Sequence, residues 1–222
     1  MENRDSLSFQ DRVQELNWGA HLCSLYRDKK EQLSVVAPYL AFGLQHNERC
    51  IYVTGDTGQE EVCRALDGSG IDIDSCLKKG QLIFLTKEET YLKNNFFSPL
   101  AMLGMIQDAH YEALRAGYSG LRGSGELNWT AQDFSGAERV IEYEREINFL
   151  FPHYHIIALC QYSEMKVPEN VLLGALRTHP KAVIHGILYD NPFYTHPAVA
   201  GKAEGDEYLP GKYYELRNRL IA

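Results

Sequence analysis

The sequence predicts an α/β protein built on a mostly parallel sheet with helices on both faces. Short apolar runs alternate with amphipathic stretches along the chain, which is the pattern of strand–helix–strand units. The chain has 222 residues, which is enough for one large domain with a sizeable core. Its composition, 45% hydrophobic and 23% charged, is that of an ordinary globular protein.

The first half of the chain is expected to alternate regularly between strands and helices. A helix over 31–46 carries Leu33, Val36 and Leu40 at helical spacing, and a second helix is expected over 59–66. Three strands alternate with these two helices, at 21–26, 50–54 and 81–86.

The second half begins with a long helix over 99–116, which places Met102 and Met105 on one face. Ser135 is expected to cap a helix that reaches 149, because Glu138 follows three residues later and completes a capping box. The remaining expected elements are strands at 118–128, 155–162 and 182–189 and helices at 168–176 and 213–220.

The strand over 118–128 carries an unusual set of polar residues on one face. Because strand side chains alternate, Arg122, Ser124 and Glu126 point the same way, and Trp129 follows at the strand's end. Burying ionised groups costs several kcal/mol per ion unless they are paired or contact a ligand. Two interpretations stay open: a structural Arg–Glu pair, or the wall of a ligand pocket at the carboxyl edge of the sheet.

Composition and charge exclude several classes of protein. A net charge of −8 without a basic cluster argues against duplex nucleic acid as the main partner. No apolar stretch approaches the roughly 18–20 residues that cross a membrane, and the N-terminus has no apolar signal core. Five cysteines without a CxxC pair indicate reduced thiols. The sequence therefore predicts a cytoplasmic protein.

No known phosphate or hydrolase motif is present. The turn Gly55-Asp-Thr-Gly58 lacks the Lys-Ser/Thr of a phosphate-binding loop, and Gly123-Ser-Gly125 is too short for a nucleophile elbow. His153 and His155 have no third metal ligand at a recognisable spacing. We therefore expect neither a catalytic residue, nor a cofactor, nor a metal.

Three further polar residues are candidates for a pocket. His21 and His179 lie at predicted strand boundaries, where a side chain reaches the rim of the sheet. Asn148 is flanked by apolar residues, and a buried asparagine needs hydrogen-bond partners. Most of the charges at Glu142, Glu144 and Glu146 are expected instead on a solvated helix face, because their spacing from Arg139 and Arg145 suits ion pairs.

An ordered series of short motifs over about residues 17–197 resembles the MEDS domain, the sensory domain named for methanogens, methylotrophs and the dichloromethane-responsive regulator. The series comprises His21-Leu-Cys-Ser-Leu-Tyr26, Gly43-Leu-Gln-His-Asn-Glu-Arg-Cys-Ile-Tyr52, Gly80-Gln-Leu-Ile, Arg122-Gly-Ser-Gly-Glu126 with Trp129, Tyr143-Glu-Arg-Glu-Ile-Asn148, Leu159-Cys-Gln-Tyr162, His179-Pro180 and Asn191-Pro-Phe-Tyr194.

The resemblance implies a three-layer, RecA-like fold without a functional Walker A loop, used as an input module for transcription factors and histidine kinases. Small hydrocarbon derivatives or one-carbon compounds would be its ligands. It divides the chain into an N-terminal extension (1–16), a sensory domain (17–197) and a C-terminal tail with a short helix (198–222). Since the tail is too short for a kinase or DNA-binding domain, we expect a protein partner or a homo-oligomer.

We therefore expect a non-enzymatic signalling module that binds a small organic molecule at the carboxyl ends of the strands. Arg122 would hold a polar or anionic group, Glu126 would accept a donor and Trp129 would give apolar contact. The full expected site is Arg122, Glu126, Trp129, His21, Tyr26, Tyr162, His179 and Asn148. Two alternatives remain: an enzyme with Glu126 as general base and His179 or His21 as its counterpart, and a ligand-free interaction scaffold.

Overall fold

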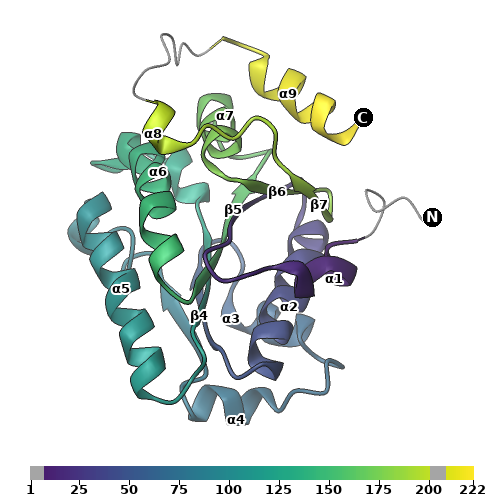
Figure 1. Cartoon of the computed structure of the whole chain (residues 1–222), viewed down its shortest axis with the longest axis vertical. Helices are drawn as coiled ribbons and strands as arrows, with labels where there is room; N and C mark the ends of the chain where they lie inside the picture. Colours follow the sequence, from purple (N-terminus) through teal and green to yellow (C-terminus); the bar gives the residue numbers. More distant parts are fainter. Residues whose placement is uncertain (1–7, 201–208) are drawn as a thin grey trace.

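The computed structural model describes residues 8–200 and 209–222, and it shows a central sheet between two layers of helices (Figure 1). The strand order is β3-β2-β4-β5-β1-β6-β7. Every neighbouring pair is parallel except β6 with β7. This confirms the predicted α/β class. The strands are β1 His21–Tyr26, β2 Arg49–Thr54, β3 Leu82–Thr86, β4 Leu121–Glu126, β5 Ile156–Ser163, β6 Lys181–Ile184 and β7 Ile187–Asp190.

Helices cover both faces of the sheet, and each face has its own apolar core. One face is covered by α1 (Phe9–Arg12), α2 (Lys29–Gln45) and α3 (Gln59–Ala65), and α4 (Ile73–Lys78) packs at the β3 edge. The other face is covered by α5 (Pro99–Arg115), α6 (Val140–Leu150) and α7 (Glu169–Thr178). The chain is completed by α8 (Pro197–Ala200) and α9 (Lys212–Ile221), and α9 packs on α7.

The last predicted strand is a hairpin rather than a single strand. β6 and β7 pair antiparallel around His185 and Gly186, whose φ values are 52° and 79°. Two central residues with positive φ form the turn that suits a two-residue hairpin, because its twist matches that of the strands. The single strand expected over 182–189 is therefore wrong.

Two helix predictions also need correction. The capping box at Ser135 is wrong, because Gly136 takes the left-handed conformation (φ 88°) and α6 begins only at Val140. The Ser135 carbonyl instead accepts a hydrogen bond from the Phe97 amide (2.9 Å). The short helix α4 was not predicted, although the Asp72 carboxylate caps it.

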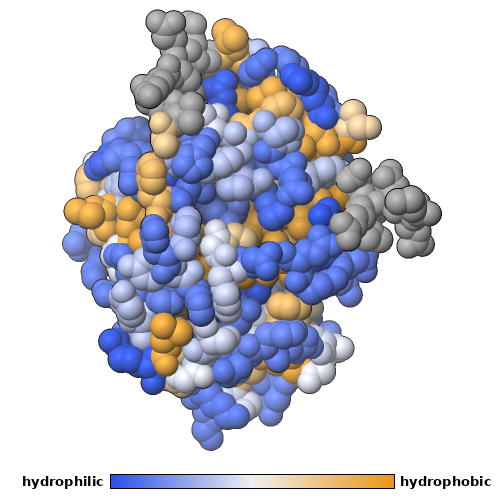
Figure 2. All heavy atoms as spheres, in the orientation of Figure 1, coloured by the Kyte–Doolittle hydropathy of each residue, from blue (hydrophilic) through white to orange (hydrophobic). Residues whose placement is uncertain are grey.

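Both ends of the described chain pack against the sheet's layers. Phe9, Val13 and Leu16, within the predicted N-terminal extension, are buried in the core on the α2 side. Near the C-terminus, the buried Tyr213 of α9 donates a hydrogen bond to Glu164, 2.5 Å away. No helix among the described residues is both long and apolar enough to cross a membrane. Figure 2 shows a mainly hydrophilic face on which hydrophobic residues are scattered in small groups.

Candidate ligand-binding site

Arg122 of β4 is sealed inside the protein and already has its counter-ion. Its side chain is fully buried on the α2 side of the sheet, with Nη2 3.1 Å from an oxygen of Glu48. The guanidinium also lies over the rings of Tyr39 and Phe42, at 4.7 and 5.3 Å from their centroids. The structure therefore corrects the role predicted for Arg122. The structural-pair interpretation holds, but the partner is Glu48 and not Glu126.

Glu126 ends β4 on the same face and binds the loop that follows β2. Its two oxygens accept hydrogen bonds from the Tyr52 hydroxyl (2.9 Å) and from the amides of Asp56 (2.8 Å) and Thr57 (3.1 Å). Burial raises the pKa of Glu126, and these hydrogen bonds only partly offset it. The converging amides that could hold a phosphate are thus occupied by the protein's own carboxylate.

Three of the predicted site residues do meet at the carboxyl edge of the sheet. Glu126 and Trp129 line a pocket of about 140 Å³ that Asn128 and Lys166 also border. Asn128 donates to the hydroxyl of Tyr26 (2.8 Å), which ends β1. This pocket is small, and its exposed lining is mainly polar.

The other four predicted residues lie on the opposite face of the sheet, around Glu144 of α6. The Tyr162 hydroxyl donates to one oxygen of Glu144 (2.7 Å). The Nε2 atoms of His21 and His179 lie 3.0 and 3.3 Å from the other oxygen. Asn148 contacts the Nδ1 atom of His21 (3.2 Å). The eight predicted residues therefore do not form one pocket, because the sheet separates Arg122, Glu126 and Tyr26 from the histidines.

Sequence reasoning missed two members of this buried cluster, Glu144 and Cys160. Glu144 is fully buried rather than solvated. Burial raises the pKa of its carboxyl group, but the nearby histidines outweigh burial, so the pKa of Glu144 is lowered. Cys160 of β5 places its sulfur 3.5 Å from Nε2 of His21 and 3.6 Å from Glu144. Burial lowers the pKa of His21 to about 4. Within the described residues, one group of side chains could hold a metal ion, and it consists of His21, Glu144, Cys160 and His179.

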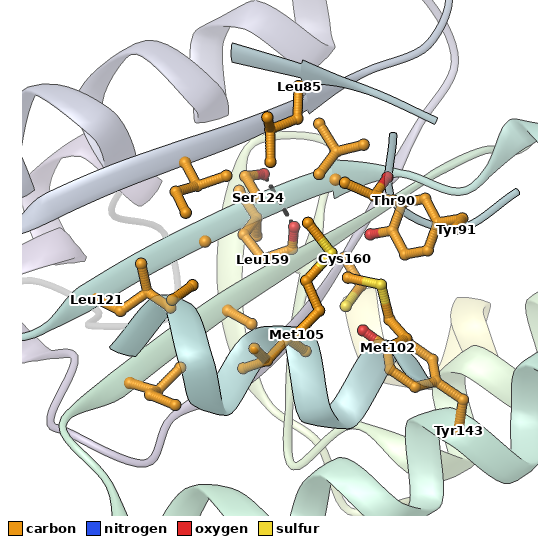
Figure 3. Close-up of a pocket in the computed structure, with 18 of the residues that line it drawn as sticks. Leu85, Thr90, Tyr91, Met102, Met105, Leu121, Ser124, Tyr143, Leu159 and Cys160 are labelled. Carbon is orange, nitrogen blue, oxygen red and sulfur yellow. Dashed lines mark hydrogen bonds between the residues drawn. The ribbon is translucent and has the colours of Figure 1, made fainter. Parts of the chain in front are cut away.

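A partly enclosed apolar cavity of about 70 Å³ lies on this same face, between α5 and the strands. Figure 3 shows Met102 and Met105 of α5 pointing toward Leu121 and Cys160 on the strands. The lining comprises Ile51, Val53, Leu85, Thr90, Tyr91, Met102, Met105, Ile106, Ala109, Leu121, Gly123, Ser124, Gly125, Tyr143, Phe151, Ile156, Ala158, Leu159 and Cys160.

Small residues of β4 and β5 create this space. Gly123 lies opposite Ala158 in the sheet, so neither neighbour extends far over the strand surface. A Cβ atom built on Gly123 would meet no atom within 4 Å. At Gly125, by contrast, the hydroxyl of Tyr91 would lie 2.1 Å from such an atom, so Tyr91 fills that position. The cavity is therefore centred over Gly123.

Two tyrosine hydroxyls border the cavity, which adjoins a wider groove. Figure 3 draws a hydrogen bond from Ser124 to Leu159 but none from the hydroxyls of Tyr91 or Tyr143 to the other residues drawn. Buried tyrosine hydroxyls usually have a partner, so these two are available to a bound molecule. The groove, of about 750 Å³, shares Met102 and other lining residues with the cavity, so the two spaces are adjacent.

Comparison with known protein families identifies one family that matches most of the chain. A model of the family described as "MEthanogen/methylotroph, DcmR Sensory domain" matches residues 20–180. The chain is also 29% identical over 160 residues to the transcriptional repressor DcmR of Methylorubrum extorquens. That alignment covers 72% of this chain and 57% of the repressor, so the chain spans little more than half of its relative's length.

Solved structures with the same architecture show the fold. The flagellar accessory protein FlaH of Methanocaldococcus jannaschii aligns with a TM-score of 0.56 and 14% identity, over 79% of this chain and 75% of FlaH. A KaiC-like protein of Pyrococcus horikoshii aligns with a TM-score of 0.52 and 11% identity, over 75% of this chain and 71% of that protein. At this identity the likeness shows the fold alone, and it confirms the predicted RecA-like arrangement.

Proposed function

The chain belongs to the MEDS family of sensory domains, and from that premise we propose that it binds a small, uncharged organic molecule in the cavity beneath α5. The observation that carries the proposal is the open apolar space over Gly123, because packed protein layers rarely leave such a space unfilled. The site differs from the one expected at the carboxyl edge of the sheet, because the edge pocket is polar and the cavity apolar.

The size and lining of the cavity limit the ligand. An engineered apolar cavity of roughly 150 Å³ in another protein holds benzene. A volume of about 70 Å³ is half of that, which suits a molecule of about three or four heavy atoms. A charged ligand would have no counter-ion among the lining residues, whereas the two tyrosine hydroxyls suit a halogen or a single oxygen. One- and two-carbon halogenated or oxygenated compounds meet both conditions.

Helix α5 is placed to pass binding to the surface. Its inner face carries Met102 and Met105 over the cavity, and its outer face carries Leu100, which is 81% exposed, and Tyr111. A ligand wedged between the sheet and α5 shifts the helix and so changes this outer face. The receiver would be a regulatory protein, such as a transcription regulator or histidine kinase, or a second copy of the chain. A relative that is a transcriptional repressor supports this direction.

The proposal is tested by thermal unfolding of the full chain in a size series of uncharged molecules, from dichloromethane to benzene. Ligand at about 100 times Kd raises the free energy of unfolding by about 2.7 kcal/mol. For a protein of this size each kcal/mol shifts Tm by roughly 2–4 °C, so a rise of about 5–10 °C is expected for the smallest molecules. Benzene, which is too large, is expected to give a much smaller rise.

Two glycine variants provide the control. Gly123→Val puts three carbon atoms into the cavity and should abolish the rise in Tm. Gly104→Ala adds a methyl group to α5 outside the cavity and should preserve it. An equal rise in both variants would place the ligand elsewhere. No rise with any molecule would favour a ligand-free interaction scaffold.

A further inference from the structure

Four buried side chains from four separate parts of the fold converge on one point beside the ligand cavity. They are His21 of β1, Glu144 of α6, Cys160 of β5 and His179, which precedes β6. Their donor atoms all lie within 4.8 Å of one another. We propose that these four residues form a closed, four-coordinate site for a Zn²⁺ ion. The site is independent of the proposed organic ligand, although Cys160 borders both.

Four of the six distances between the donor atoms are close to the edges of a zinc tetrahedron. Zn–N bonds of about 2.0–2.1 Å and Zn–S bonds of about 2.3 Å give edges of roughly 3.3–3.6 Å. The Nε2 atom of His21 lies 3.0 Å from Glu144 Oε2 and 3.5 Å from the Cys160 sulfur. Glu144 Oε2 lies 3.3 Å from Nε2 of His179 and 3.6 Å from the sulfur. Small side-chain shifts would admit the ion.

Hydrogen bonds at the far side of each imidazole fix which nitrogen faces the centre. Nδ1 of His179 lies 2.7 Å from the Ala175 carbonyl, which can only accept, so this nitrogen carries a proton. Asn148 donates through its amide nitrogen to two carbonyls, so its oxygen accepts from Nδ1 of His21. In the neutral rings both Nε2 lone pairs therefore point at the Glu144 carboxylate. A cation between them converts this repulsion into coordination, and metal-bound histidines show this same outer hydrogen bond.

Charge balance also favours a divalent ion. An isolated charge in a dry interior is costly, and Glu144 is fully buried. Zn²⁺ with one thiolate and one carboxylate is neutral overall, and binding releases the thiol proton of Cys160 to solvent. Nε2 of His179 lies 3.3 Å from Oε2 of Glu144 but makes no well-aligned hydrogen bond within the described part of the chain, so its lone pair is available as a ligand.

The arrangement resembles that of structural zinc sites. Four protein ligands leave no open coordination position, whereas catalytic sites keep one for water or substrate. The Tyr162 hydroxyl holds the second oxygen of Glu144, and Asn148 orients the ring of His21. The ion would clamp α6 onto β1 and β5 next to the cavity. It would thus fix the wall against which α5 moves.

Metal content and cobalt spectroscopy of the full chain test this proposal. Protein purified without chelator should hold one zinc per chain. After removal of zinc, Co²⁺ should give the visible bands of a tetrahedral ion and a near-ultraviolet band from thiolate-to-cobalt charge transfer. Cys160→Ser should lose the charge-transfer band, and Asn148→Leu, which alters a positioning residue, should weaken binding by about 10–100-fold.

Cys50→Ser is the matched control, because Cys50 is also buried but lies in the core on the opposite face of the sheet. It should retain the cobalt spectrum unchanged. X-ray absorption of the wild-type protein gives the ligand set of two nitrogens, one oxygen and one sulfur, even if the Cys160 variant fails to fold. Wild-type protein that binds no stoichiometric zinc or cobalt would overturn the proposal. So would a sulfur-free metal environment, or a charge-transfer band that survives in Cys160→Ser.

Discussion

Replacing Arg122 by methionine should destabilise the protein severely without affecting ligand binding. The change leaves Glu48 as an unpaired charge with 4% exposure. Removing one partner of a buried ion pair costs about 3–5 kcal/mol. Since the whole domain is expected to have about 5–15 kcal/mol of stability, this loss is a large fraction of it. The loss of the contacts with Tyr39 and Phe42 acts in the same direction.

Urea unfolding of Arg122→Met measures this loss directly. Adding Glu48→Leu should restore most of the stability, because the double variant leaves no charge unpaired. Arg139→Met breaks an exposed ion pair with Glu142 and should change little. The Tm rise caused by dichloromethane should persist in Arg122→Met, since the ion pair and the cavity lie on opposite faces of the sheet. A stable Arg122→Met protein that has lost the ligand-induced rise would refute this reasoning and restore Arg122 as a ligand contact.

Two further outcomes are expected. Gly123→Ala should raise the free energy of unfolding by about 0.4–1 kcal/mol, because its methyl group enters open space. Gly136→Ala should instead lower the free energy of unfolding, because φ there is +88° and a Cβ would lie 2.3 Å from a carbonyl oxygen. Urea titrations measure both changes, and the same change in stability for both variants would contradict the cavity over Gly123. Burial raises the pKa of Glu164, but hydrogen bonds from Tyr213 and Arg217 outweigh burial, so its folded pKa is lowered. The stability that Glu164 contributes is present above its ordinary pKa and is lost as pH falls through the folded pKa. Hydrogen exchange in α9 should therefore accelerate as pH falls through the folded pKa, and Glu164→Gln should show no such change.

The sequence predicts most of the fold because strands and helices leave periodic patterns. Expected strands such as 21–26 and 81–86 lie within one residue of the observed ones. The β6–β7 hairpin was missed because its turn uses His185 at positive φ, a conformation uncommon for residues other than glycine. The six-residue α4 is too short to leave a clear helical period.

The predicted site was only partly correct because pairing across the fold leaves no local signal. The counter-ion of Arg122 comes from Glu48, which precedes β2 and is 74 residues away in the sequence. Glu144, however, lies at helical spacing from the buried Val140 and Ile147, so α6 itself carried a sign that this carboxylate faces inward.

Whether the space over a glycine stays open depends on which distant side chains pack against it, and the sequence does not show that packing. Alternation along β4 placed Gly123 and Gly125 on the face opposite the polar residues. The sequence cannot tell that Tyr91, from the segment after β3, covers Gly125 and leaves Gly123 open. Polar residues drew the prediction to one face of the strand, while the apolar space lies on the other.

The most direct test of the cavity as the ligand site is a crystal equilibrated with dibromomethane, in which anomalous scattering locates the bromine atoms. We expect bromine over Gly123, between β4 and Met105 of α5. Bromine bound only beside Trp129 at the carboxyl edge of the sheet, or no ordered bromine at all, would contradict the proposed site.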